Sequence, residues 1–148
     1  MDAADASVLA VLLPSAIKIV EPFTIMDSAK GKAKRDWIEL WLQAQNVLSS
    51  PGLMIAGKLR VELSEYRPAR GNAKGPRLEH WNIDLATIAD QRKYWNAVTQ
   101  MYEFRLGYDR DRIPRADKYV LSVIYQPPIG ARLTDEITLI RNQSETPQ

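Results

Sequence analysis

The chain has 148 residues, of which 26% are charged and 45% hydrophobic, close to the averages of globular proteins. Its 20 basic and 18 acidic residues leave a net charge of only +2. The absence of cysteine and the presence of one histidine exclude disulfides, thiol catalysis and metal sites built from thiolates or several histidines.

The expected organisation is one domain between two short ends. We expect residues 1–15 to be an N-terminal extension, residues 16–141 a single β-sandwich domain and residues 142–148 a disordered polar tail. Residues 8–13 are apolar but follow two aspartates, which does not match the basic leader of a signal peptide. Two interpretations stay open: a cytoplasmic protein, or an exported domain whose targeting segment has been removed. No run is long enough for a membrane span, so no transmembrane segment is expected.

Alternating polar and apolar residues, separated by turn-forming residues, predict strands. The first four are expected at Ala16–Ile25, Asp36–Gln45, Gly57–Tyr66 and Arg77–Ala86. Pro22 predicts an edge position or a break within the first of them. In the fourth, alternation turns Trp81 toward the core and His80 toward solvent.

The hydrophobic period changes after the fourth strand. Thr87 and Asp90 form a weak capping box, which predicts the start of a helix. A stripe at helical spacing predicts that this helix covers Ile88–Val98 and packs Trp95 onto the sheet. The stripe consists of Ile88, Gln91, Trp95 and Val98.

Three further strands complete the expected fold, at Gln100–Gly107, Lys118–Gln126 and Arg132–Ile140. The second of these is apolar on both faces, which predicts a central position in its sheet. About seven strands with one short inserted helix near residues 88–98 predict an all-β fold, a two-layer antiparallel β-sandwich.

The segment 117–121, Asp-Lys-Tyr-Val-Leu, resembles the tyrosine corner of immunoglobulin-like sandwiches. The resemblance implies that the Tyr119 hydroxyl bonds to upstream backbone and that Trp37 or Trp41 acts as the core tryptophan. The pattern also resembles C2-like and transthyretin-like sandwiches and the domains of uncharacterised bacterial surface lipoproteins. It implies an extracytoplasmic location and carries no catalytic residues. The chain departs from the immunoglobulin pattern in lacking the cysteine pair and in the insert near Trp95.

Trp37 and Trp41 share one face of the second expected strand. Two interpretations are open for that face. The inserted helix covers it through Trp95 and Ile88, or it is an aromatic patch for a partner.

Basic residues gather in three connections that alternation of strand direction places at one end of the sandwich. Segments 27–35, 67–77 and 108–118 carry net charges of +3, +4 and +1, so together they carry +8 and the rest of the chain carries −6. Two interpretations of this dipolar distribution are open: the basic residues only keep the loops soluble, or they form a site for an anionic surface or polymer. The anion-binding candidates are Lys30, Lys32, Lys34, Arg35, Arg67, Arg70, Lys74, Arg77, Arg110, Arg112 and Arg115.

These patterns favour a non-enzymatic binding or assembly module, extracytoplasmic and bacterial, whose basic loops contact an anionic surface, a glycan or an acidic protein. We assign no catalytic residue, metal ligand or cofactor, because His80 lies on an outer face and no nucleophile motif is present. A cytoplasmic nucleic-acid-binding module is the alternative, although only Tyr108 is near to stack on bases. A small hydrolase is the third candidate.

Overall fold

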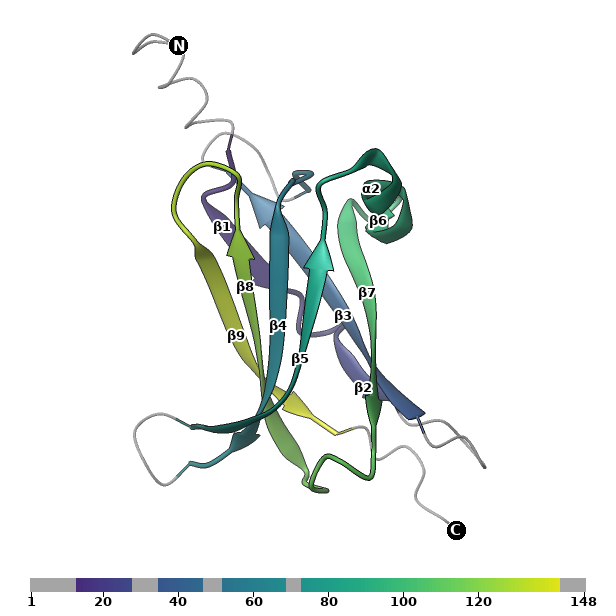
Figure 1. Cartoon of the computed structure of the whole chain (residues 1–148), viewed down its shortest axis with the longest axis vertical. Coiled ribbons are helices and arrows are strands. Elements are labelled where there is room, and N and C mark those ends of the chain that lie inside the picture. Colours follow the sequence, from purple (N-terminus) through teal and green to yellow (C-terminus); the bar gives the residue numbers. More distant parts are fainter. Residues whose placement is uncertain (1–12, 28–34, 47–51, 69–72, 142–148) are drawn as a thin grey trace, which may run out of the picture.

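The computed structural model describes residues 13–27, 35–46, 52–68 and 73–141, and these ranges form two antiparallel sheets packed face to face (Figure 1). The expected tail 142–148 and most of the expected extension 1–15 lie outside the described residues. In chain order the elements are β1 (Ala16–Ile19), β2 (Ile25–Asp27), β3 (Arg35–Gln45), β4 (Lys58–Tyr66), β5 (Lys74–Asp84), α2 (Ile88–Tyr94), β6 (Trp95–Asn96), β7 (Met101–Asp109), β8 (Lys118–Gln126) and β9 (Leu133–Ile140).

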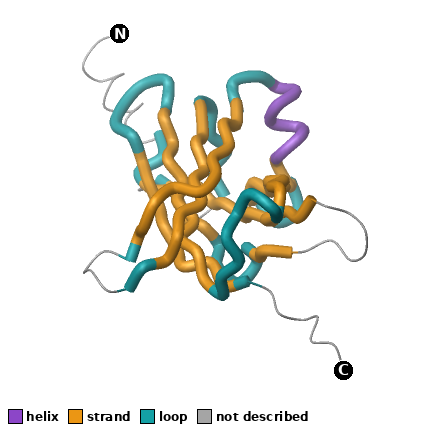
Figure 2. The backbone as a smooth tube through the Cα atoms, turned by 60° about the horizontal axis from the view of Figure 1, so that its bottom comes forward, coloured by secondary structure: helices purple, strands orange, loops and turns teal. Residues whose placement is uncertain are grey.

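The first sheet has the order β1-β3-β7-β6, and β2 also pairs with β3. The second sheet has the order β5-β4-β8-β9. Figure 2 shows that strands make up most of the described chain, with the short helix beside them. The prediction of an all-β sandwich with one helix is therefore confirmed. So is the central position of β8, which lies between β4 and β9.

The single strand expected at Ala16–Ile25 is instead two strands, β1 and β2. A turn at residues 21–23 separates them and contains Pro22. Proline has no backbone N–H and cannot donate to a ladder, which explains why pairing with β3 stops there and resumes afterwards.

The helix is shorter than expected, and only Gln91 and Trp95 of the predicted stripe contact the sandwich. The capping box is present, with Thr87 and Asp90 each bonding the other's backbone N–H. The helix ends at Tyr94, because the next residue is extended and pairs with β7. Ile88 is 74% exposed and Val98 is 94% exposed.

Gln91 and Tyr94 hold the helix against the sandwich, and the Tyr94 ring lies 4.9 Å from that of buried Phe104. The Gln91 side-chain amide donates to the carbonyls of Ile55 and Leu85 at 2.7 and 2.8 Å. Its oxygen accepts the hydroxyl of buried Tyr102 at 2.6 Å. Trp95 packs edge-on against Tyr102, with ring centroids 4.9 Å apart, so it reaches the core from β6 and not from the helix.

The core fills the space between the sheets. Inward-facing side chains alternate along the inner strands, and the largest fully buried ones include three tyrosines whose hydroxyls find partners. Among the described residues, the fully buried hydrophobic ones are Ile38, Leu40, Leu42, Val61, Leu63, Leu85, Tyr102, Leu121 and Val123, with Phe104, Tyr119 and Tyr125 almost completely buried.

A side chain bridges the two sheets at each lateral edge of the sandwich. On one side the Asp135 carboxylate of β9 accepts the Ile19 N–H of β1 at 2.7 Å. On the other, the indole N–H of Trp81 in β5 donates to the Gly107 carbonyl of β7 at 2.9 Å. Trp81 is half-buried against the core, so its expected inward orientation holds, and it also satisfies an edge carbonyl.

Tyr119 makes the contacts expected of a tyrosine corner. Its ring is 1% exposed, its hydroxyl donates to the Pro114 carbonyl at 2.6 Å, and it accepts the Ala116 N–H at 3.0 Å. Both partners lie in the connection from β7 to β8, so this one side chain ties that connection to the core.

We predict that Tyr119→Phe lowers the free energy of unfolding by about 1 kcal/mol or more, because it removes a buried hydrogen bond and leaves the Ala116 N–H without its acceptor. Chemical denaturation measures the change. Tyr66→Phe is the matched control, since the structure gives the Tyr66 hydroxyl no hydrogen bond to any described residue. Equal stability of wild type and Tyr119→Phe would contradict the prediction.

Candidate functional site

Strand ends that flank three basic segments of the sequence lie at the same end of the sandwich, which we call the basic end. The pairing of Arg35 with Asp109 places the start of β3 beside the end of β7. The pairing of Glu65 with Tyr119 places the end of β4 beside the start of β8. The basic end thus comprises the strand termini around segments 28–34, 67–73 and 110–117, at the bottom of Figure 1.

Not every anion-binding candidate can be placed. Lys30, Lys32, Lys34 and Arg70 lie outside the described residues. For Arg35, the structure describes the backbone alone, in β3. The remaining candidates are Arg67, Lys74, Arg77, Arg110, Arg112 and Arg115, and they differ sharply in what surrounds them.

Arg110 is committed to a buried ion pair. One of its guanidinium nitrogens lies 2.9 Å from a carboxylate oxygen of Asp36, whose side chain is 0% exposed. Burial, reinforced by the negative charge of Asp36, raises the pKa of neighbouring Tyr108 to about 12. Because removing one partner of a buried ion pair leaves the other uncompensated at a large cost, Arg110 serves the interior before any external anion.

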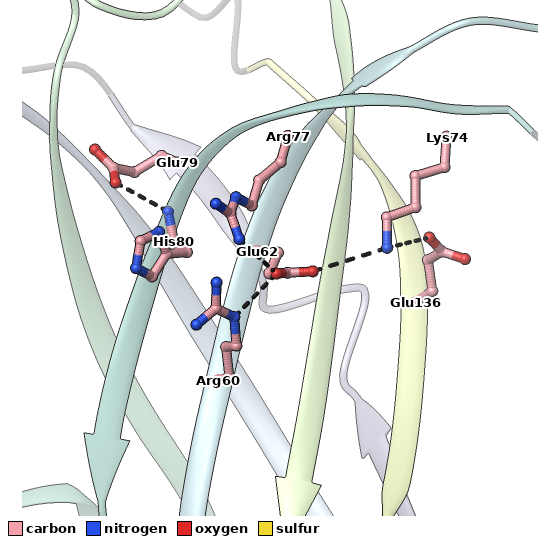
Figure 3. A network of polar contacts seen from close by, with 7 residues as sticks. All are labelled: Arg60, Glu62, Lys74, Arg77, Glu79, His80 and Glu136. Atoms are coloured by element: carbon pink, nitrogen blue, oxygen red, sulfur yellow. Dashed lines mark hydrogen bonds and ion pairs between the residues drawn. The ribbon is translucent and has the colours of Figure 1, made fainter.

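Glu62 gathers three more cations on the outer face of the second sheet (Figure 3). Arg60 lies 3.0 Å from its carboxylate, Arg77 3.3 Å and Lys74 4.0 Å. The hydrogen bond from Arg60, helped by Arg77 and opposed by partial burial, lowers the pKa of Glu62. Two of the anion-binding candidates, Lys74 and Arg77, thus share an internal counter-ion.

The bend of the β4–β5 hairpin creates this network. The register of β4 against β5 shifts on both sides of Ser64, and such bulges bend and twist a strand pair. Beyond the shift, the hairpin sweeps across β8 and β9 (Figure 1). Lys74 consequently reaches Glu136 of β9 at 3.9 Å, and Val120 and Ser122 are buried although they face away from the core.

His80 stands beside this network without joining it through its ring. It pairs with Glu62 across the β4–β5 ladder and is exposed, as alternation predicts. Its backbone N–H donates to the Glu79 carboxylate at 2.9 Å. Within the described residues there is no cluster of three histidines or carboxylates suited to a metal ion.

Arg112 and Arg115 are the basic candidates that point outward from a fixed support. Both are exposed, and neither has an ion pair to another described residue. Between them Ile113 is buried, and the Tyr119 hydroxyl bonds to the backbone of Pro114 and of Ala116. Arg67, by comparison, lies 2.7 Å from Glu65.

The two tryptophans of β3 are not covered by the helix, so that interpretation is wrong. They are half-buried on the outer face of the first sheet. The guanidinium of Arg105 lies 4.0 Å from the ring centre of Trp37, and Phe23 packs edge-on against Trp41 at 5.8 Å. The side chains that cover these rings therefore come from β7 and from the turn before β2.

Comparison with protein-family models, with curated proteins and with solved structures finds no match for this chain. Function is therefore argued from geometry and charge. In the part of the chain that the structure describes, no helix combines the length and the apolar character needed to cross a bilayer.

We predict that Glu62→Gln destabilises the protein at neutral pH by up to about 1 kcal/mol, a figure reduced for solvent screening. Since the folded-state pKa of Glu62 is lowered, its stabilisation is present above its unfolded value of 4.5 and is lost as pH falls through the folded value. The difference from wild type should therefore shrink as the pH falls below the unfolded value and through the lowered folded one.

Urea denaturation at several pH values tests this. Glu103→Gln, at an exposed position of β7 without an ion pair to a described residue, should show little change at any pH. A Glu62→Gln effect that stays constant down to acidic pH would contradict the assignment.

Proposed function

We propose that this protein is a non-enzymatic β-sandwich binding module whose basic end contacts an anionic surface. The observation that carries the proposal is the position of Arg112 and Arg115. They are exposed side chains on a connection that is fixed to the core, at the end of the sandwich where β4 ends and β3 begins.

The support for a surface, in preference to a small ligand, comes from how these arginines are held. Their backbone is already ordered by Ile113 and Tyr119, so contact with an anion orders only the side chains. Guanidinium groups bind phosphate oxygens in a bidentate fashion. Two such exposed groups on one ordered connection suit a layer of phosphate head groups.

The alternative of single-stranded nucleic acid is less well supported. Tyr108 was the residue expected to stack on bases, and it is 3% exposed. Tyr66 is half-buried, with the Lys118 ammonium over its ring at 5.5 Å. Single-strand binders use several accessible aromatic faces, and the described part of the basic end offers few.

The proposal includes an extracytoplasmic location and a relationship to immunoglobulin-like or bacterial lipoprotein sandwiches. What supports the relationship is the tyrosine corner at Tyr119. A module of that kind would sit at a cell envelope, where anionic head groups are abundant. The location and the relationship both stand as proposals.

We predict that the protein sediments with phosphatidylglycerol-containing vesicles at low salt and is released near physiological ionic strength, because exposed charges are screened over about 8–10 Å there. Replacing Arg112 and Arg115 by glutamate should abolish sedimentation. Stability should change by about 0.5 kcal/mol or less, since both side chains are on the surface.

The matched control is Arg92→Glu with Lys93→Glu on α2, at the opposite end of the sandwich (Figure 1). This pair gives the same change in net charge. Retained sedimentation in the α2 variant supports a localised site. Equal loss in both variants would show that net charge alone matters and would refute the basic end as the site.

A further inference from the structure

A second cationic surface lies at the other end of β4, on the outer face of the second sheet. The sheet is hollowed there by about 440 Å³, within the range of small-molecule pockets. Side chains from β4, β5, β8 and the turn before β9 line the hollow. The polar ones used below are Lys58, Arg60, Asn82, Asp84, Gln126 and Arg132, and Ile124 supplies the apolar part.

Strand register fixes how these groups are arranged. Arg60 stands between Asn82 on β5 and Ile124 on β8. Lys58 stands between Asp84 and Gln126 in the adjoining row. Since neighbouring strands are about 4.8 Å apart, the polar groups spread over roughly 10–14 Å, which is wider than an inorganic anion and comparable to a sugar ring with its substituents.

Two cationic side chains of the hollow, Lys58 and Arg132, are exposed and can contact a ligand. The Asp84 carboxylate already accepts the Ala86 N–H at 2.9 Å. The Arg132 guanidinium is held weakly, 3.4 Å from the Gln126 side-chain oxygen. Lys58 is exposed and has no ion pair to a described residue. Arg60 is oriented by Glu62 at 3.0 Å, so its position is set before any ligand arrives.

We infer that this hollow binds a sugar acid, a hydroxyl-bearing ring that carries a carboxylate. Lys58 and Arg132 bind the carboxylate through charge-assisted hydrogen bonds. Asn82 and Gln126 offer amide donors and acceptors to hydroxyl groups. Ile124 lies beneath the C–H face of the ring. An apolar residue among a few polar groups that fix orientation is typical of small-molecule sites.

The site is separate from the basic end. β4 runs from Lys58 at the hollow to Tyr66 at the basic end, a distance of about 26 Å for an extended strand. The inference therefore does not rest on the proposed function, and variants at one end test it without disturbing the other.

The test is a titration of the ¹⁵N-labelled full chain with D-glucuronate, followed by NMR at constant ionic strength, with D-glucose and sodium sulfate as comparison ligands. We expect saturable shifts of the backbone amides in Lys58–Arg60, Asn82–Asp84 and Ile124–Gln126, stronger for glucuronate than for either comparison ligand. Absence of saturable shifts there, or equal binding of sulfate and glucuronate, would overturn the assignment.

The variant Lys58→Gln with Arg132→Gln should weaken glucuronate binding at least about tenfold, because it removes both charged donors. Arg112→Gln with Arg115→Gln, which removes the same charge at the basic end, should leave it unchanged. Both pairs are exposed, and the dispersion of the spectrum reports folding. If the spectrum of the Lys58→Gln, Arg132→Gln variant loses dispersion, the single variant Lys58→Gln is titrated instead. Unchanged affinity after the Lys58 and Arg132 changes would refute the site.

Discussion

The carboxylate of Asp36 is buried at the basic end of the sandwich. The arrangement of that end depends on the residue that forms an ion pair with it. The Asp36 side chain is 0% exposed on β3, directly across from Tyr108 of β7. A buried carboxylate without a cation costs several kcal/mol. Arg110, the first residue after β7, supplies the cation at 2.9 Å. The chain must therefore turn inward as it leaves the first sheet.

That inward turn determines which arginines reach solvent. Once Arg110 is engaged, Ile113 is buried and the Tyr119 hydroxyl fixes Pro114 and Ala116, so the connection crosses to the second sheet along a defined path. Arg112 and Arg115 flank these anchors and remain exposed. The outer face of the second sheet differs, because there Glu62 forms ion pairs with Lys74 and Arg77. From the sequence alone, these two residues were assigned to a basic loop.

Local signals in the sequence predicted what depends on local chemistry. Alternation placed the strands, Thr87 and Asp90 marked the helix start, and the motif around Tyr119 predicted its backbone bonds. Helical spacing correctly turned Gln91 toward the sandwich, but it could not show that the contact is polar, because the partners of Gln91 are two backbone carbonyls and the Tyr102 hydroxyl. Pro22 predicted either an edge position or a break in the first strand, and the structure has the break.

Pairings across strands could not be predicted, because they require register. Neither Asp36 with Arg110 nor Glu62 with Lys74 is close in sequence. The β4–β5 bulge that folds Lys74 over β8 leaves no clear sequence signal beyond Gly75 and Pro76. For the same reason Lys58 and Arg132 were not candidates: only the ladders bring them to one hollow.

The most direct measurement is a double-mutant cycle on the pair that organises the basic end, with Asp36→Ala, Arg110→Ala and the double variant compared by denaturation. Loss of one partner leaves the other uncompensated, so the two effects should be coupled by about 1–3 kcal/mol. Hydrogen exchange of the Ala116 amide should accelerate in both single variants. Additive effects within about 0.5 kcal/mol, with unchanged Ala116 protection, would contradict the role assigned to Asp36 and Arg110.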